Sequence, residues 1–422
     1  MEETQALNKE TPTEETKLPL NRTALILILG LLATIDPFSI DFYLPAFADI
    51  AKDMGTTTAK ISLSLSSYFI GLAIGQISYG PVIDRFGRKR PLYFGLTGYM
   101  VACVGCMLTH SVNALIVMRF IQALAGGVAG IGAFAMVRDF FPVKESAKVF
   151  SFLMLIIGIS PLLAPSIGGF IADWWGWQSV FAVLIGIVIV MMAIVYFFLP
   201  EGHQPDHSVS LKPRPILLNF YSILKNPQFI TYTLSGTFSF TALFIYVAGA
   251  PVIFMDIFKV SPRAFGLIFT LLSVGFLSSS QLNIVFLKKF TSQKIFQVAL
   301  GVQILLSVLF FIGAINHWLG LVPTIVFFLL ILSCMGSINP NGSALALAPF
   351  TSNVGSASAL MGFLQLSISS VISSLIGLLN AVNLIQITSL LAATAILAQL
   401  ILFYGKKRIK HLVTGEGVVA MH

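Results

Sequence analysis

The fold of this chain is decided by the stretch Gly80-Pro-Val-Ile-Asp84-Arg85-Phe-Gly87-Arg88-Lys89-Arg90-Pro91. It places five charged residues between two long apolar runs, near 60–79 and 91–109, in a chain of 422 residues that is only 10% charged. Each run is long enough to cross about 30 Å of hydrocarbon at about 1.5 Å per residue. The stretch is therefore predicted to be a tight loop between two membrane-spanning helices, with its basic residues marking the cytoplasmic side.

The composition independently indicates a membrane protein. Hydrophobic residues make up 56% of the chain, 36 residues are Phe, and the mean hydropathy is +0.91. A soluble protein needs far more charge on its surface. Twelve apolar segments are each about long enough to span a bilayer. They lie near 23–46, 60–80, 91–109, 113–137, 148–171, 178–199, 228–250, 264–287, 294–314, 318–339, 355–380 and 383–404.

The basic residues predict the orientation. With the N-terminus in the cytoplasm, 20 of the 25 Lys and Arg residues fall in cytoplasmic segments. This strong positive-inside bias predicts that both termini are cytoplasmic. The net charge of +8 is then explained by membrane orientation, because the basic residues are scattered among loops and form no face for nucleic acid. The first 20 residues are polar and of mixed charge, which indicates a tail and not a cleavable signal.

The chain divides once, at its longest polar stretch between spans. Residues 201–227 are predicted to be a cytoplasmic linker between a six-helix half at 23–200 and a second at 228–404. Residues 1–22 and 405–422 are the cytoplasmic tails. Other duplicated membrane proteins have halves of similar length.

Ionisable residues inside spans are candidates for function, because each is costly in hydrocarbon unless it faces a cavity or a partner. Asp36 and Asp41 lie in the first span, at about 15 and 7 Å from its outer end. Five residues apart, they are about 140° apart around an ideal helix and are predicted to face different surroundings, although Pro37 changes that angle if it bends the helix. Arg119 lies about 10 Å below the outer end of the fourth span, at the depth of Asp41.

The fourth span also predicts where Arg119 points. Arg119, Gln122, Gly126 and Gly130 form one helical stripe of polar and small residues, which is typical of a face packed on protein. Two interpretations stay open. Arg119 forms a fixed buried ion pair that orients the bundle, or it modulates a carboxylate whose proton load changes as a cavity opens and closes. Asp41 is the first choice for that proton carrier and Asp36 the second.

Several motifs resemble those of known transporters. The 80–91 stretch is similar to the loop signature between the second and third helices of the major facilitator superfamily. Segments in both halves resemble the bicyclomycin-resistance (Bcr/CflA) branch of its twelve-span drug/proton antiporters. These are Ile35–Ala46, Val137-Arg138-Asp139 and Gly355–Gln365. Arg119 with Gln122 and Gly126-Gly127 is similar to the family's fourth-span motif, in which the Arg is implicated in proton coupling, and Gly158–Gly169 resembles the fifth-span motif associated with antiporters.

The resemblance implies an all-α major facilitator fold with twelve transmembrane helices in two six-helix halves. It also implies proton-driven efflux of small, largely apolar drugs across the bacterial inner membrane. We expect a monomer without cofactor or metal. The alternatives are export of an endogenous amino acid, nucleoside or siderophore, uptake symport, and sensing without transport. No Walker, HExxH or Gly-x-Ser-x-Gly motif occurs in the sequence, so we expect no enzyme activity.

Three groups of residues are expected to serve this function. A conformational latch is predicted from Gly80, Asp84, Arg85, Gly87, Arg88 and Asp139, in which the arginines bridge to Asp139 or Glu145; an ordinary basic loop is the alternative. An antiporter-type motif, or a merely kinked helix, comprises Gly158, Pro161, Pro165, Gly168 and Gly169, with Ala164 where a Gly is usual. The substrate cavity is expected to include Tyr43, Tyr68, Gln122, Met154, Tyr246, Asn341 and Gln365, with many other Phe and Met residues facing lipid.

Overall fold

The computed structural model is a bundle of long helices. It describes residues 21–141, 143–202, 205–206, 213–350, 354–378, 383–414 and 417–420; within these ranges, the side chains at 143–148, 151, 154, 213, 414 and 417–420 are not described. The predicted roles of Glu145 and of the Met154 side chain therefore concern parts of the chain outside the described residues.

The first half of the chain runs from α1 to α9. Its elements are α1 (Arg22–Ala33), α2 (Ile35–Asp41), the 3₁₀ turn η1 (Leu44–Ala46), α3 (Phe47–Asp53), α4 (Thr58–Phe86), α5 (Lys89–Leu108), α6 (Val112–Gly126), α7 (Val128–Phe140), α8 (Val143–Trp175) and α9 (Gln178–Phe197). The linker contains α10 (Pro213–Leu224).

The second half runs from α11 to α16 and ends in a hairpin. Its elements are α11 (Pro227–Pro251), the short π-helix η2 (Val252–Ile257), α12 (Pro262–Leu287), α13 (Ser292–Ile315), α14 (Leu321–Leu347), α15 (Val354–Leu378), α16 (Leu384–Lys406), β1 (His411–Thr414) and β2 (Gly417–Ala420). The two strands pair antiparallel, with His411 opposite Ala420.

Eleven helical segments of the described chain are long and apolar enough to cross a membrane, and the count is twelve if α1 and the 35–53 segment form one span bent by 42°. The predicted first span at 23–46 is thus broken near Thr34. Pro37 explains the break, because proline has no N–H to donate and its ring crowds the carbonyl of Ala33, four residues earlier.

The structure corrects the predicted loop at 80–91. Helix α4 continues through Pro81 to Phe86 and α5 begins at Lys89, so only Gly87 and Arg88 lie between them. The apolar pattern of the sequence marks only the part of a helix that lies in hydrocarbon. The helix itself can continue into water as long as its backbone hydrogen bonds stay satisfied. For the same reason α14 extends eight residues beyond the predicted end at 339, and the predicted linker includes helix α10.

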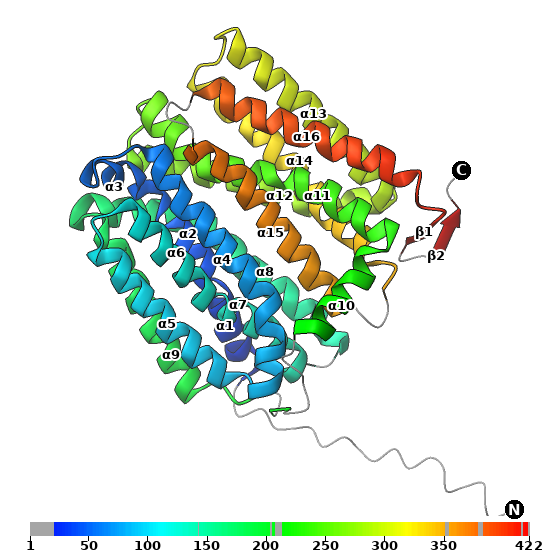
Figure 1. The fold of residues 1–422 in the computed structure, drawn as a ribbon, viewed down its shortest axis with the longest axis horizontal. Coiled ribbons are helices and arrows are strands. Elements are labelled where there is room, and N and C mark those ends of the chain that lie inside the picture. Colours follow the sequence, from blue (N-terminus) through cyan, green and yellow to red (C-terminus); the bar gives the residue numbers. More distant parts are fainter. Residues whose placement is uncertain are drawn as a thin grey trace, which may run out of the picture.

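The two halves lie side by side (Figure 1). Helices α1 to α9 fill the lower left of the view, and α11 to α16 the upper right. Helix α4 packs against α15 and α8 against α12 across the boundary. Counted as spans, these pairs are the second with the eleventh and the fifth with the eighth. Exchanging the halves maps one pair onto the other, as expected for duplicated halves related by a two-fold axis.

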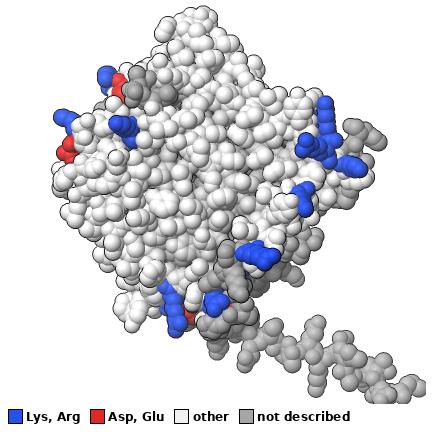
Figure 2. Space-filling model, in the orientation of Figure 1, with Lys and Arg blue, Asp and Glu red and all other residues white. Residues whose placement is uncertain are grey.

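Charged residues collect at the two ends of the bundle. We call the end that carries Arg22, Arg88 and α10 the basic face, and the opposite end the α3 face. Figure 2 shows Lys and Arg along the edge with α10 and the end of α16, mixed charges near α3, and an uncharged band between them. Large apolar side chains are exposed in this band, such as Phe94 at 86%. Such a surface suits lipid and not water.

Candidate functional site

Asp36 of α2 lies between α4 and the fourth span, which comprises α6 and α7. Its Oδ1 accepts a hydrogen bond of 2.9 Å from the hydroxyl of Tyr68 on α4. Glycines of the fourth-span stripe face the same carboxylate, because a Cβ at Gly126 would stand 3.4 Å from Oδ1 and one at Gly130 would stand 3.9 Å from Oδ2. The small residues of the stripe therefore leave room for a carboxylate inside the first half.

Arg119 on α6 is fully buried between two aromatic rings. Its Cζ lies 4.4 Å from the ring centre of Tyr43 and 4.2 Å from that of Tyr68. Nη1 donates to Gln122 Oε1 at 2.6 Å, Nη2 donates to the carbonyl of Ser39 at 3.1 Å, and Nε has no hydrogen-bond partner. Within the described part of the chain, no carboxylate lies at ion-pair distance from Arg119. The described residues thus form no fixed ion pair with Arg119.

Asp41 faces different surroundings from Asp36, as their spacing predicts. The hydroxyl of Ser160 on α8 donates to Asp41 Oδ2 at 3.2 Å, and Asp41 is only 6% exposed. Arg119, expected at the depth of Asp41, donates to the carbonyl of Ser39 and shares Tyr68 with Asp36. The two carboxylates therefore contact different helices: Asp36 contacts α4, and Asp41 contacts α8 at the boundary with the second half.

Sequence reasoning missed four residues of this cluster, Ser39, Ser64, Tyr99 and Cys103, which bond to one another or to predicted residues. Ser39 and Tyr99 hydroxyls lie 2.5 Å apart, Tyr43 and Ser64 hydroxyls lie 2.7 Å apart, and Gln122 donates to the sulfur of Cys103 at 3.0 Å. All are buried. A signal existed, since isolated hydroxyl residues recur in the first and second spans, but Ser is common in membrane helices and does not by itself reveal its partner.

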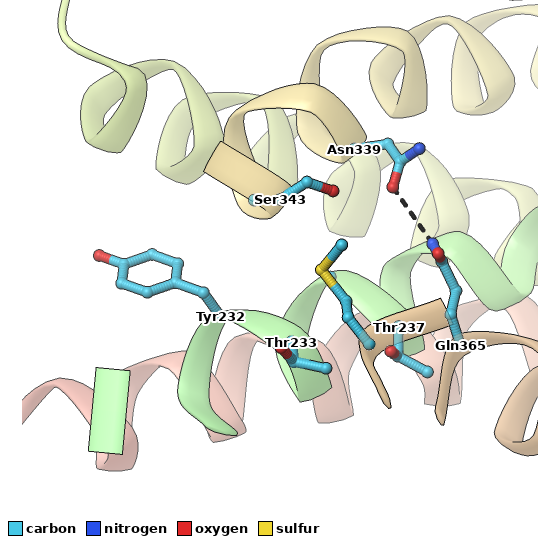
Figure 3. A pocket seen from close by; sticks show the side chains of 9 residues that line it. Tyr232, Thr233, Thr237, Asn339, Ser343 and Gln365 are labelled. Atoms are coloured by element: carbon cyan, nitrogen blue, oxygen red, sulfur yellow. Dashed lines mark hydrogen bonds between the residues drawn. The ribbon is translucent and has the colours of Figure 1, made fainter. Parts of the chain in front are cut away.

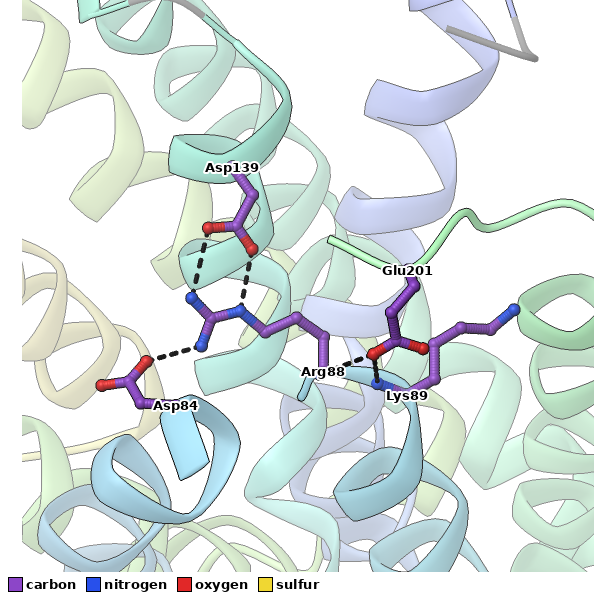
Figure 4. A network of polar contacts seen from close by, with 5 residues as sticks. All are labelled: Asp84, Arg88, Lys89, Asp139 and Glu201. Carbon is purple, nitrogen blue, oxygen red and sulfur yellow. Dashed lines mark hydrogen bonds and ion pairs between the residues drawn. The ribbon is translucent and has the colours of Figure 1, made fainter. Parts of the chain in front are cut away.

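Arg88 is the centre of the predicted latch (Figure 4). It binds Asp139 through two bonds, Nε to Oδ2 at 2.8 Å and Nη2 to Oδ1 at 3.2 Å, and binds Asp84 Oδ1 through Nη1 at 2.7 Å. Burial alone would lower the pKa of Arg88, but the hydrogen bonds and charges of Asp139 and Asp84 outweigh it and raise that pKa. The guanidinium therefore stays charged and joins α4 to the end of α7. The Cζ of Arg85 lies 5.9 Å from the ring centre of Phe86.

Glu201, for which the sequence predicted no site role, connects the linker to the residues around Arg88. Its Oε1 accepts from the backbone N–H groups of Arg88 at 2.9 Å and Lys89 at 3.1 Å, at the start of α5 (Figure 4). A carboxylate is favourable there, because the first N–H groups of a helix have no partner within it. The backbone N–H of Asp206 also donates to the carbonyl of Asp84 at 3.1 Å. The sequence signal is an acid directly after a span.

Two glycines of the latch are expected to differ on substitution. Gly87 has φ +80°, and an added Cβ would stand 2.9 Å from Glu201 Oε1, whereas a Cβ at Gly80 would meet no atom within 4 Å. We expect Gly87→Ala to destabilise the protein by about 1–2 kcal/mol, because side chains are strained at positive φ. Gly80→Ala is the matched control and should be nearly neutral. Thermal unfolding of both purified variants tests this, and equal stability would contradict the assigned role of Gly87.

The antiporter-type motif lies at the contact of α8 with the first span and with α12. An added Cβ at Gly168 would clash with the backbone of Phe42, and one at Gly169 would stand 3.4 Å from Pro45. A Cβ at Gly158 would stand 3.2 Å from Leu277 of α12. Pro161 and Pro165 both lie inside the single helix α8. The glycines therefore permit close approach, while the prolines leave two carbonyls of α8 without their usual donors.

The residues expected to line a substrate cavity are dispersed. Tyr43, Tyr68 and Gln122 pack around Arg119. In the second half, the ring of Tyr246 lies 5.2 Å from that of Phe328, and Asn341 donates to Asn283 of α12 at 2.6 Å. Gln365 lines a small polar cavity between α11, α14 and α15 (Figure 3).

The fold and these motifs match a known family. A model of the Major Facilitator Superfamily matches residues 29–374. The chain belongs to this superfamily. It is therefore a multi-pass membrane transporter and not an enzyme, and the fold class predicted from the sequence is confirmed.

Relatives in bacteria agree with the predicted branch. The chain is 30% identical over 352 residues to the bicyclomycin resistance protein homolog of Haemophilus influenzae, covering 83% of this chain and 88% of the relative. It is 28% identical to multidrug resistance protein D of Escherichia coli, covering 84% and 89%. It is 28% identical to a chloramphenicol resistance protein of Pseudomonas aeruginosa, covering 76% of each. The resemblance to the bicyclomycin-resistance branch is thus confirmed.

A solved structure has the same fold. The crystal structure of a D-xylose–proton symporter superposes with a TM-score of 0.70 over 90% of this chain and 97% of that chain, at 18% sequence identity. At this identity the similarity establishes the fold alone.

Proposed function

We propose that this chain exports small, largely apolar compounds, including antibiotics, across the bacterial inner membrane in exchange for protons. The names of its relatives support the substrate class, and the basic face supports a cytoplasmic location for both termini. The two halves supply the moving parts, so we propose a monomer. The proton gradient drives transport, without a cofactor.

The proton coupling is proposed from one observation. The buried guanidinium of Arg119 has no carboxylate at ion-pair distance among the described residues, while the partly buried carboxylate of Asp36 accepts from the hydroxyl of Tyr68, whose ring covers Arg119. A buried charge without a counterion is costly. Loss of the proton from Asp36 would create that counterion, and Tyr68, which donates to Asp36 and covers Arg119, must move for the charges to meet. Proton release is thereby linked to rearrangement of α2, α4 and α6.

Asp41 is proposed to carry the exchanged proton. It is the last residue of α2 and binds Ser160 of α8, the helix that packs against α12 of the second half. Its protonation therefore bears directly on the boundary that moves when the halves rock. Asp36 and Arg119 set the charge of the first half around it.

The decisive experiment measures substrate-induced proton movement in proteoliposomes across a compound library. In antiport, substrate added outside drives protons out of the vesicle, whereas symport drives protons in with the substrate. Proton entry with substrate would favour an uptake symporter and contradict this proposal. A drug-susceptibility panel on an expressing strain then separates drug efflux from export of an endogenous amino acid, nucleoside or siderophore.

The latch makes a separate prediction. Asp84→Asn is expected to cut transport about tenfold while expression and equilibrium substrate binding persist, because Arg88 keeps Asp139 but loses one charge-assisted bond. Asp84 is 49% exposed, so the effect on stability is small. Transport rate and binding should be measured on the same preparation, with Asp173→Asn on the α3 face as control. Normal transport by Asp84→Asn would remove the latch.

A further inference from the structure

A small polar cavity lies in the second half, between α11, α14 and α15 (Figure 3). Its volume of about 10 Å³ is room for one water molecule or one small polar group. The polar side chains that line it are Thr233, Thr237, Asn339, Ser343 and Gln365. Ser343 lies four residues before the end of α14 and Gln365 eleven after the start of α15, so the cavity extends from about 6 to about 17 Å below the basic-face ends of these helices.

The cavity has unused hydrogen-bonding capacity. Gln365 Nε2 donates to Asn339 Oδ1 at 3.1 Å, and the described residues offer no further hydrogen bond to the carbonyl oxygen of Gln365 or the amide nitrogen of Asn339 (Figure 3). The hydroxyl of Thr233 is buried and, among the described residues, has no partner. By contrast, Thr231 and Thr241 on the same helix donate to the carbonyl four residues earlier. A buried hydroxyl without a partner is unfavourable and marks a place for a polar guest.

The cavity is accessible on one side. Asn339, Ser343 and Gln365 are partly exposed, whereas Thr233 and Thr237 are buried at its floor. Gly236 of α11 is also partly exposed, so the cavity has an accessible opening above the two buried threonines. A group of a larger molecule can enter it while the rest of that molecule stays outside.

The three helices that line the cavity carry no charged residue. Helices α11, α14 and α15 contain no Asp, Glu, Lys, Arg or His along their whole length, while the first half holds Asp36, Asp41 and Arg119 in its interior. An ionised group in the cavity would lose its water without gaining a counterion, which is strongly unfavourable. A neutral hydroxyl or amide can instead donate and accept at once.

We propose that this cavity binds an uncharged hydroxyl or amide group of the exported compound, and that Gln365, Asn339 and Thr237 recognise that group. The inference rests on the proposed export function and divides the labour between the halves. The first half handles protons, and the second half selects neutral hydrogen-bonding substrates. The position near the basic face fits entry of the compound from the cytoplasmic side.

The test uses chloramphenicol, a neutral compound with amide and hydroxyl groups, as the transported probe. Full-length protein in proteoliposomes with an imposed pH gradient should export it, and Gln365→Leu should raise its KM about tenfold with little change in kcat, because one neutral hydrogen bond is lost. Thr237→Val, of nearly equal shape, should raise KM in the same direction and remains informative if Gln365→Leu folds poorly.

A matched control is Gln303→Leu on α13. Gln303 is fully buried and exchanges two hydrogen bonds with Ser239, at 2.6 and 3.2 Å, outside the cavity. The Gln303→Leu variant should lower thermal stability and leave the KM for chloramphenicol unchanged. Unchanged KM in folded Gln365→Leu and Thr237→Val, with only their thermal stability altered, would mean that the cavity holds a structural water and would overturn this proposal. An equal rise of KM in Gln303→Leu would also overturn it.

The wild type distinguishes failure of the cavity proposal from failure of the proposed function. If it couples other compounds to proton movement but not chloramphenicol, only the cavity proposal fails. If it couples no compound to proton movement, the proposed function itself fails.

Discussion

Asp41→Asn should abolish transport driven by a pH gradient, by about 100-fold or more, while equilibrium substrate binding persists and loses its pH dependence. Asparagine keeps the shape and can still accept the hydrogen bond from Ser160. It cannot exchange a proton. The variant therefore removes the proton carrier with little disturbance of packing between α2 and α8. Transport and binding should be measured in proteoliposomes over a range of pH.

The control for this variant is Asp53→Asn. Asp53 accepts a hydrogen bond of 3.0 Å from the indole of Trp177 at the α3 face, so its substitution repeats the chemistry outside the membrane interior. It should transport normally. Asp36→Asn provides the contrast inside the membrane and should slow transport and shift its pH optimum, because Arg119 loses its nearest potential counterion. If Asp41→Asn transports at the full rate and Asp36→Asn does not, the carrier is Asp36.

The sequence predicted the membrane fold and the division into halves because both depend on composition averaged over long segments. Twenty apolar residues identify a span whatever their partners are. Local breaks were harder. The bend near Thr34 has a visible cause in Pro37, but the continuation of α4 to Phe86 does not, since charged residues in water are compatible with either a loop or a helix.

Partners across the bundle were beyond sequence reasoning. The depth of Arg119 was correctly related to the first span, since it contacts the carbonyl of Ser39. Its closer association with Asp36 than with Asp41 depends on how α2 rotates after the break at Thr34, and a helical wheel does not fix that rotation. Glu201 likewise shows its role only when the linker is seen to return to the start of α5.

Substitutions of Arg119 distinguish a role in proton coupling from a structural role. After Asp41→Asn, they are expected to have the largest effect on proton-driven transport. Breaking a fixed buried ion pair costs about 3–5 kcal/mol, because the remaining charge is stranded. Arg119 has no such pair in the described structure, so removing it strands only the amide of Gln122 and the carbonyl of Ser39. Arg119→Met fills a similar volume without charge and should cost less stability than that, while proton-driven transport falls about 100-fold or more.

Arg119→Lys is the complementary variant. It keeps the positive charge between the rings of Tyr43 and Tyr68 but loses the planar guanidinium that bonds Gln122 and Ser39 together. If coupling requires only a positive charge beside Tyr68, this variant retains substantial transport with a shifted pH optimum. Thermal unfolding and transport should be measured on the same purified Lys and Met variants. Parallel loss of stability and transport in both would assign Arg119 a structural role, whereas loss of transport from the stable Met variant, with recovery in the Lys variant, requires that the charge itself couples proton release to movement of the halves.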